Sequence, residues 1–192
     1  LALTLIEFVL LWTIGDMNWF DSINHALTTM PTGGFSTYDA SIGHFDSYTV
    51  ELIIILFMFI GGINFTLLWF IREGQFKKAT QDEEFKNYIV YILTTFLFIT
   101  IALLATRDYS STDAFIDSLF HVVSLGTSTG YTSTDYMQWP VVTHLFLFVL
   151  MIVGASAGST SGGLKLLRIN LAFKVAMREL VRIAQPRKVQ TI

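Results

Sequence analysis

The sequence predicts an all-α polytopic membrane protein made of two tandem repeats, each a helix, a short re-entrant helix, a glycine turn and a second helix. Three observations predict this class: the composition, the length of the apolar stretches, and a set of residues that recurs at a fixed interval. Hydrophobic residues make up 53% of the chain and charged residues only 14%, a balance well outside that of water-soluble domains. The chain is therefore expected to fold in lipid.

Two apolar stretches are long enough to cross a bilayer as single helices. Residues 50–71 cover 22 positions with one acid near the start, and residues 88–106 cover 19 positions without a charge. At about 1.5 Å per residue, each reaches across a hydrocarbon core of roughly 30 Å. A third span is expected to start at Pro140 and to continue to about Ala172. Residues 1–14 are too short to span alone, which indicates a piece of a longer polypeptide.

A set of residues recurs after 96 positions. The paired positions are Asp21/Asp117, Ser22/Ser118, His25/His121, Gly34/Gly130, Asp39/Asp135, Gly62/Gly158 and Arg72/Arg168. Agreement over so much of the chain indicates an internal duplication. We divide the chain into a first repeat, 1–86, and a second repeat, 87–192, the latter with a glycine-rich segment at 154–163.

Each repeat contains a segment that is too apolar for a loop and too short to cross. Residues 19–30 and 115–125 are 12 and 11 residues long, about 17 Å as helix, which is typical of a re-entrant helix. Acids and capping residues stand at the start of each segment and a glycine turn follows its end, so the negative helix end faces the turn. Such an end favours a cation, and non-helical backbone at this depth is tolerated where it lines a cavity.

The two turns read PTGGFS at 31–36 and TSTGYT at 127–132. Glycine permits backbone angles closed to other residues, and small residues let successive carbonyls face one axis, where they can replace the water around an ion. Two turns in register, each behind a short helix, favour this interpretation over an ordinary turn. The aromatic residue of each turn is expected to pack outward. The candidate residues are Thr32, Gly33, Gly34, Phe35, Ser128, Thr129, Gly130 and Tyr131.

The charges of the chain are separated along the sequence. Eleven of the twelve Lys and Arg residues lie in 72–86 and 165–188, which the positive-inside rule places in the cytoplasm. The opposite segments, 15–49 and 107–139, hold eight aspartates and one arginine, and an acidic mouth concentrates cations. Solvated loop residues explain the same acids equally well. Cysteine is absent, which excludes disulfides and thiolate metal sites.

Residues 154–163 form a second candidate element. Four of the ten are glycine and the others are Ala, Ser or Thr. Because each glycine costs a helix about 1 kcal/mol relative to Ala, this segment is expected to unwind. Tight helix packing through small residues is the alternative. Gly61 and Gly62 of the first repeat are a milder equivalent, for which packing or a simple kink is expected.

Two motifs, TGGFST at 32–37 with DASIG at 39–43, and GASAGSTSGGLK at 154–165, resemble the Trk/Ktr/HKT superfamily of potassium transporters. The similarity is greatest to the membrane subunits of bacterial Trk systems (TrkH/TrkG type) and covers nearly the whole chain. Proteins of this family carry four potassium-channel-like units of helix, pore helix, filter loop and helix around one ion path. The resemblance implies that this chain holds units two and three.

The resemblance also implies site residues. Potassium, as the substrate, is implied to bind the backbone carbonyls of Thr32, Gly33, Gly34, Ser128, Thr129 and Gly130. Glycine at positions 34 and 130 favours potassium over sodium, and the intramembrane loop below the filter is implied to act as a gate. The implied gate residues are Gly154, Gly158, Ser159, Thr160, Gly162, Gly163 and Lys165.

The resemblance further implies a location and partners. It implies a multi-pass protein of the bacterial inner membrane, surrounded by lipid, with its filter mouths extracytoplasmic and its full-length form a homodimer. A cytosolic nucleotide-binding regulatory subunit (TrkA type) is implied to dock on the basic segments 72–86 and 165–188, although a solvated tail explains the same charges. We expect no cofactor and no nucleic-acid partner.

Two other functions fit parts of the sequence. An ion-coupled secondary transporter, such as a sodium or proton symporter, would place its substrate at broken helices, but the direction of the re-entrant helices favours channel-like cation passage. The sequence from Gly154 to Gly158 matches the nucleophile-elbow pattern G-x-S-x-G of an intramembrane serine protease. A nucleophile needs a base, and histidines 25, 44, 121 and 144 are expected to lie apart from Ser156.

Two further features stay open. The Asp21/His25 and Asp117/His121 pairs could bind a metal or move protons, but a helix-capping Asp and an anchoring His explain the duplication more simply. Glu7 lies inside an apolar helix, where an acid by default indicates function, and the sequence does not fix its depth.

Overall fold

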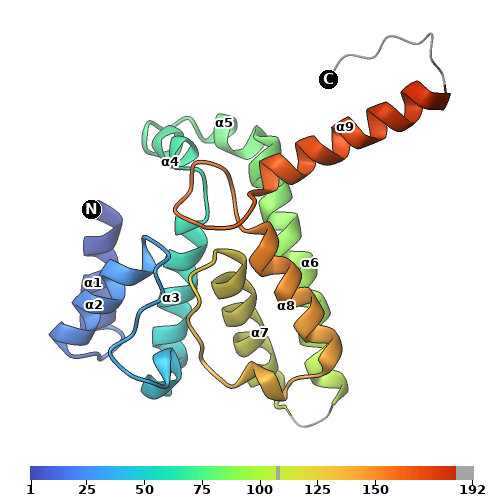
Figure 1. Cartoon of the computed structure of the whole chain (residues 1–192). Coiled ribbons are helices and arrows are strands. Elements are labelled where there is room, and N and C mark those ends of the chain that lie inside the picture. Colours follow the sequence, from blue (N-terminus) through green and yellow to red (C-terminus); the bar gives the residue numbers. More distant parts are fainter. Residues whose placement is uncertain (107–108, 185–192) are drawn as a thin grey trace.

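The computed structural model describes residues 1–106 and 109–184, and every regular element among them is helical (Figure 1). The first repeat contains α1 (Ala2–Thr13), α2 (Trp19–Thr29), the short 3-10 helix η1 (Ser41–Phe45), α3 (Tyr48–Gly61), α4 (Phe65–Arg72) and α5 (Phe76–Gln81). The second repeat contains α6 (Glu83–Ala105), α7 (Ser111–Gly126), η2 (Tyr136–Gln138), α8 (Val141–Val153) and α9 (Leu166–Ala184). The all-α prediction is confirmed. The division at residue 86 stays a prediction, and the helix that opens the second repeat begins at Glu83.

Helix α6 crosses the whole height of the bundle. It has 23 residues and is the one described helix that is by itself long and apolar enough to span a membrane. Asp82 caps it by accepting a hydrogen bond from the backbone N–H of Phe85 (2.8 Å), which satisfies a donor that the helix leaves free. One face of α6, including Ile92 and Ile99, is buried in the bundle, whereas side chains such as Leu97 and Ile101 are exposed. Exposed apolar side chains on a spanning helix face lipid.

The two short helices lie where the sequence predicts them. Helix α2 matches residues 19–30 closely, whereas α7 begins at Ser111, four residues before the predicted start. The reason is local, because the side chain of Ser110 accepts from the backbone N–H of Asp113 (3.1 Å) and starts the helix earlier. Helix α7 packs against α3, α6 and α8, and α2 packs against α1 and α3. Both helices are thus packed inside the bundle by the helices around them.

The predicted single span over residues 50–71 is wrong. Helix α3 ends at Gly61, α4 begins at Phe65, and the two axes differ in direction by 102°. Asn64 caps α4 by accepting from the backbone N–H of Thr66 (2.9 Å), so the break has a helix stop and a helix start of its own. The expected kink at Gly61 and Gly62 is therefore a full break, and hydropathy alone cannot show it because the residues on both sides of it are mostly apolar.

The third span also differs from its prediction. Helix α8 ends at Val153, and the chain then forms a non-helical loop before α9 starts at Leu166. Helix α9 does not continue the line of α8 but leaves the bundle at a steep angle (Figure 1). Residues 140–172 are therefore not one continuous helix, as the glycine content of the loop predicts.

Candidate functional site

The two glycine turns follow the C-terminal ends of α2 and α7 and share one backbone conformation. In the first turn Thr32 and Gly34 have φ angles of 54° and 67°, and in the second Ser128 and Gly130 have φ angles of 58° and 87°. The residue between each pair does not have a positive φ. This alternation points consecutive peptide groups in a common direction, which builds a concave row of like dipoles. Each turn can therefore present several carbonyl oxygens to one ion.

The carbonyl oxygens of the turns divide into two groups. Among the described residues, no hydrogen bond reaches the carbonyl oxygens of Thr32, Gly33, Gly34, Ser128, Thr129 or Gly130. The next carbonyl is bonded in both turns: the Thr28 hydroxyl donates to Phe35 O (2.9 Å), and the Ser124 hydroxyl donates to Tyr131 O (2.7 Å). Because no donor within the described structure uses them, these six carbonyl oxygens are available to a cation.

The backbone hydrogen bonds of the turns are duplicated with the sequence. The N–H of Gly33 donates to Thr28 O, and the N–H of Thr129 donates to Ser124 O, each at 2.8 Å. Thr28 and Ser124 are 96 residues apart, so the predicted repeat extends to individual bonds. Each short helix thus holds its own turn from behind.

The acids of the repeated motif tie the far side of each turn to its helix. Asp21 Oδ1 accepts from the Thr37 hydroxyl (2.6 Å), and Asp117 Oδ1 accepts from the Ser133 hydroxyl (3.0 Å). The predicted capping role of Asp21 and Asp117 is wrong. Asn18 is the N-cap of α2 and accepts from the Asp21 backbone N–H (2.8 Å), and Ser110 is the N-cap of α7. Since Asp21 lies one turn into the helix, its carboxyl is free to hold the turn.

The two histidines of the motif contact the preceding turn of their own helices, and His25 also contacts the residue after its glycine turn. The Nδ1 atoms of His25 and His121 lie 2.7 and 2.9 Å from the carbonyl oxygens of Asp21 and Asp117. His25 Nε2 lies 2.9 Å from the hydroxyl of Ser36 just past the first turn. No group of three or more His, Asp or Glu side chains suited to a metal occurs in the described part of the chain. His25 therefore anchors α2 to the first turn, as the sequence predicts, whereas His121 Nε2 has no hydrogen-bond partner among the described residues.

The aromatic residues of the two turns differ in their surroundings. Tyr131 is fully buried, and its hydroxyl lies 2.6 Å from the hydroxyl of Thr28 in the first repeat. Phe35 has 76% of its surface exposed. Tyr131 therefore packs around the turns as predicted, against the short helix of the first repeat. Phe35 holds the equivalent position in the first turn but is exposed in this chain.

The two turns touch each other through backbone. A Cβ atom at Gly34 would collide with the carbonyl oxygen of Thr129, whereas a Cβ at Gly130 would meet nothing within 4 Å. Gly34 therefore combines a positive φ with a close approach of two chains, and both conditions require glycine. This contact brings residues about 95 positions apart into one site, which the repeat alone did not establish.

Beyond the turns lies the loop at 154–165. Positive φ angles of 70°, 71° and 78° occur at Gly154, Gly158 and Gly163, and Lys165 has 71°. These angles end α8 and reverse the chain, which agrees with the predicted unwinding. The Lys165 ammonium group donates to Ser161 O inside the loop, so the lysine closes the loop on itself.

The loop lies directly against the inner side of both turns. The Thr32 hydroxyl donates to the carbonyl oxygen of Thr160 (2.9 Å), and a Cβ at Gly162 would lie 3.3 Å from the Cβ of Ser128. The predicted gate residues Thr160 and Gly162 are thus next to the first residue of each candidate carbonyl set. Gly158 faces the other way, toward the side chain of Asn64 at the break between α3 and α4.

The break between α3 and α4 supplies the partners of the loop, a function that the sequence did not predict. The Thr160 hydroxyl lies 3.0 Å from the carbonyl oxygen of Gly61, the N–H of Ser156 donates to Gly62 O (3.2 Å), and the N–H of Phe65 donates to Gly158 O (3.1 Å). An unbroken helix would use these backbone groups internally. The adjacent glycines Gly61 and Gly62 are the sequence feature that could have indicated this break.

The structure also shows the surroundings of Glu7 and Ser156. Glu7 is fully buried in α1 beside Thr29, and neither carboxyl oxygen has a hydrogen-bond partner among the described residues. The hydroxyl of Ser156 likewise has none, and the nearest partners of His144 and His44 are Tyr136 O and the Tyr38 ring. The nucleophile-elbow pattern therefore lacks a base in the described structure.

Re-entrant helices that end at carbonyl-rich turns, packed among other apolar helices, define a membrane protein of the pore-loop class. The sequence profile of the TrkH family, described as cation transport proteins, matches residues 9–107 and again residues 85–192. The chain belongs to this family.

Individual relatives agree with this assignment. The Trk system potassium uptake protein TrkH of Vibrio parahaemolyticus is 41% identical over all of this chain and 40% of its own length. TrkH of Escherichia coli K12 is 40% identical over 95% of this chain and 38% of its own, and TrkG of the same organism is 32% identical over 97% and 39%. The crystal structure of the potassium transporter TrkH from Vibrio parahaemolyticus superposes with a TM-score of 0.93 at 40% identity, covering all of this chain and 42% of that one. The chain thus spans about two fifths of the length of these relatives.

Proposed function

We propose that this chain forms half of a potassium-uptake pore, in which the carbonyl oxygens of the two glycine turns bind dehydrated potassium ions. The observation that carries the proposal is the set of six carbonyl oxygens that have no hydrogen-bond partner while the next carbonyl in each turn does. Carbonyl rings of this kind replace the hydration shell of a cation. The relatives named above are potassium uptake proteins, which supports potassium as the ion.

The contacts between the repeats support a ring of more than two turns. Gly34 approaches Thr129 of the following turn, and Tyr131 binds Thr28 of the preceding short helix. If the same relation continues, Gly130 meets a further turn on one side, and Phe35 packs against a further short helix on the other. Two more repeats would close the ring, in agreement with the greater length of the relatives. We expect this chain to be inactive alone.

We further propose that the loop at 154–165 is the gate. It lies against Thr32 and Ser128 on the inner side of the turns, so an ion that leaves the carbonyls in that direction meets it. Its backbone is non-helical, and it is held by individual hydrogen bonds that can exchange partners. Movable backbone at membrane depth suits a gate because it lines the path itself.

The remaining assignments follow from the charge pattern and the relatives. The acidic segments that carry Asp21 and Asp117 lie at the outer mouth, and the basic segments at 72–86 and 165–188 face the bacterial cytoplasm. Helix α9 projects from the bundle on that side (Figure 1) and offers a docking site for a cytosolic regulatory subunit. We propose homodimeric assembly for the full-length protein.

A direct test compares glycine variants in a complete transporter, which we define as this chain in place of the matching segment of Vibrio parahaemolyticus TrkH. The reversal potential in planar bilayers under opposed potassium and sodium gradients is measured for Gly34→Ser, for Gly130→Ser and for the unchanged chain. Gly74→Ser is the control, since Gly74 also has a positive φ but its Cβ would meet nothing within 4 Å, and it lies away from the turns.

The expected result is a reversal near the potassium potential that moves toward the sodium potential in both turn variants and stays unchanged in the control. Selectivity that is indifferent to both turn variants would refute the carbonyl site. A flux that requires a sodium or proton gradient would instead favour the ion-coupled transporter.

A further inference from the structure

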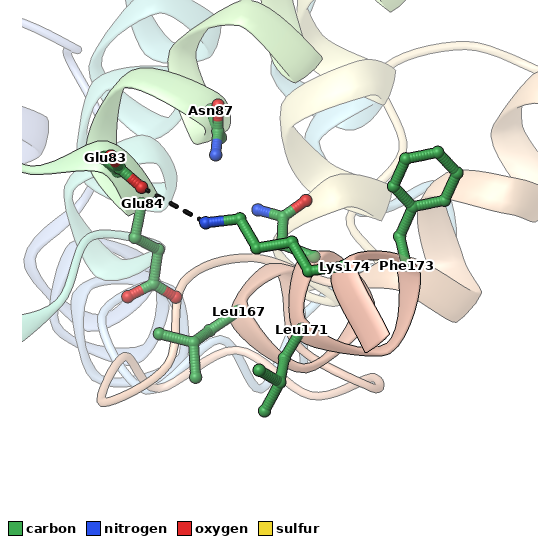
Figure 2. A pocket seen from close by; sticks show the side chains of 8 residues that line it. Glu83, Glu84, Asn87, Leu167, Leu171, Phe173 and Lys174 are labelled. Atoms are coloured by element: carbon green, nitrogen blue, oxygen red, sulfur yellow. Dashed lines mark ion pairs between the residues drawn. The ribbon is translucent and has the colours of Figure 1, made fainter. Parts of the chain in front are cut away.

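Two adjacent glutamates at the start of α6 have different partners. Glu83 is exposed, and its Oε2 lies 3.6 Å from the ammonium group of Lys174 in α9. Glu84 is only 9% exposed, and its Oε1 accepts a hydrogen bond from the backbone N–H of Ala157. Figure 2 shows the two carboxyl groups pointing in different directions at the pocket between α6 and α9. The second glutamate therefore reaches the loop that we propose as the gate.

Ala157 stands at a particular point in that loop. The backbone groups on either side of it, the N–H of Ser156 and the carbonyl of Gly158, bond to the break between α3 and α4. The N–H of Ala157 turns the other way and has Glu84 as its partner. Among the described residues, Glu84 is the one carboxyl that bonds to the loop. The loop is thus held from the first repeat on one side and from α6 on the other.

The hydrogen bond between Ala157 and Glu84 has a carboxylate as its acceptor. A hydrogen bond from an N–H to a carboxylate contributes about twice as much as a neutral one, and its loss would leave the N–H of Ala157 without a partner. The backbone of Glu84 is held in place because this residue stands in the first turn of a 23-residue helix that Asp82 caps. A rigid helix thereby sets the position of the loop beneath the glycine turns.

The structure also provides space for the carboxyl after release. The pocket beside it has a volume of about 400 Å³ and is lined by polar groups of Asn87 and Asn170 as well as by Leu167 and Leu171. Both amides can donate hydrogen bonds to a carboxylate. A rotation of the Glu84 side chain away from Ala157 would therefore exchange one set of donors for another.

We propose that Glu84 is the latch of this transporter: its carboxyl holds Ala157, and with it the loop at 154–165, in the closed position, and opening requires the release of this bond. The latch rests on the proposed function of the loop as the gate. Glu84 acts through the loop and does not touch the ion, so it is a positioning residue. Its loss changes how often the path is open and leaves the choice between potassium and sodium unchanged.

The first test measures basal potassium flux into proteoliposomes that contain the complete transporter. Because a charged hydrogen bond is removed, Glu84→Ala is expected to raise the basal flux about tenfold or more. Glu84→Gln keeps the acceptor oxygen and is expected to raise it less. Glu83→Ala, the matched control in the same turn, is expected to match the unchanged protein, and the reversal potential is expected to be the same for all four proteins.

The second test reads the loop itself. Ser159→Cys places one thiol in the loop of a complete transporter in which every other cysteine has been replaced by serine, and the rate of its modification by a water-soluble thiol reagent is measured with and without Glu84→Ala. Faster modification together with higher flux supports the latch. Unchanged or lower flux with an unchanged modification rate overturns it, even if the potassium selectivity of the parent is confirmed. If the parent shows no selective potassium flux, the proposed function fails, and the modification rate alone decides whether Glu84 holds the loop.

Discussion

The contact between the two turns makes a quantitative prediction about glycine. Alanine at Gly34 or at Gly130 must adopt a positive φ, which costs about 1–2 kcal/mol for an L residue. At Gly34 the new Cβ would also overlap the carbonyl oxygen of Thr129 and lie 2.8 Å from its carbonyl carbon. Displacing a packed turn to relieve such an overlap costs about 1–3 kcal/mol more. At Gly130 the new Cβ would meet nothing within 4 Å, so the φ cost stands alone.

The two substitutions should therefore differ in this chain although the sequence motifs are alike. Gly34→Ala is expected to lower the free energy of unfolding by about 2–5 kcal/mol and Gly130→Ala by about 1–2 kcal/mol. For a chain of this size, 1 kcal/mol corresponds to about 2–4 °C in Tm, so the first variant should melt several degrees below the second. Thermal unfolding of the 192-residue chain in detergent micelles, followed by near-UV circular dichroism, measures the difference.

The same pair in the complete transporter provides the control. If a further turn lies against Gly130 there, the two alanine variants should be destabilised to similar extents. Equal melting temperatures in the 192-residue chain would mean that Gly34 and Thr129 are not in contact, and this outcome would refute the packing of the turns described above.

Two further predictions concern single hydroxyl groups. Tyr131→Phe removes a buried bond to Thr28 (2.6 Å) and should destabilise the chain by about 1 kcal/mol. In bilayer recordings it should also lower selectivity, whereas Tyr109→Phe, which loses a bond from Trp139 outside the turns, should leave selectivity intact. A Tyr131→Phe protein with unchanged reversal potential would contradict the supporting role of Tyr131. Thr160→Val removes the contacts of this hydroxyl with Met30 O and Gly61 O (both 3.0 Å). It should raise basal flux in proteoliposomes because the loop is then held less firmly to the break between α3 and α4. Thr80→Val, which removes an exposed hydroxyl in α5, is the control, and equal flux in both variants would contradict this role of Thr160.

Much of the fold could be predicted from the sequence because its signals are local. The apolar length of residues 88–106 predicts the spanning helix α6, and the short apolar segments before each glycine turn predict α2 and α7. The repeat of 96 residues predicts equivalent bonds in the two halves, such as those of Thr28 and Ser124. In each case neighbouring residues in the chain decide the structure.

The features that the sequence did not predict all depend on contacts between residues far apart in the chain. Residues 50–71 are apolar over most of their length, so hydropathy cannot distinguish one helix from two helices that meet at 102°. The bend is stabilised by partners in the loop at 154–165, which lies about 100 residues away in the sequence. The same reasoning applies to Glu84, which as a single acid at a helix start looks like an ordinary first-turn residue until its partner Ala157 is known.

The sequence by itself determined the membrane class, the duplication, the short helices and the conformations that the turn glycines must adopt, because these depend on composition and on neighbouring residues. The tertiary structure decided which surfaces meet: Gly34 with Thr129, Tyr131 with Thr28, the break after Gly61 with the loop, and Glu84 with Ala157. Most of these contacts involve at least one backbone group that no side-chain pattern marks, since every residue other than proline carries the same N–H and C=O. Only the folded chain shows which of those groups are paired and which are left to bind an ion.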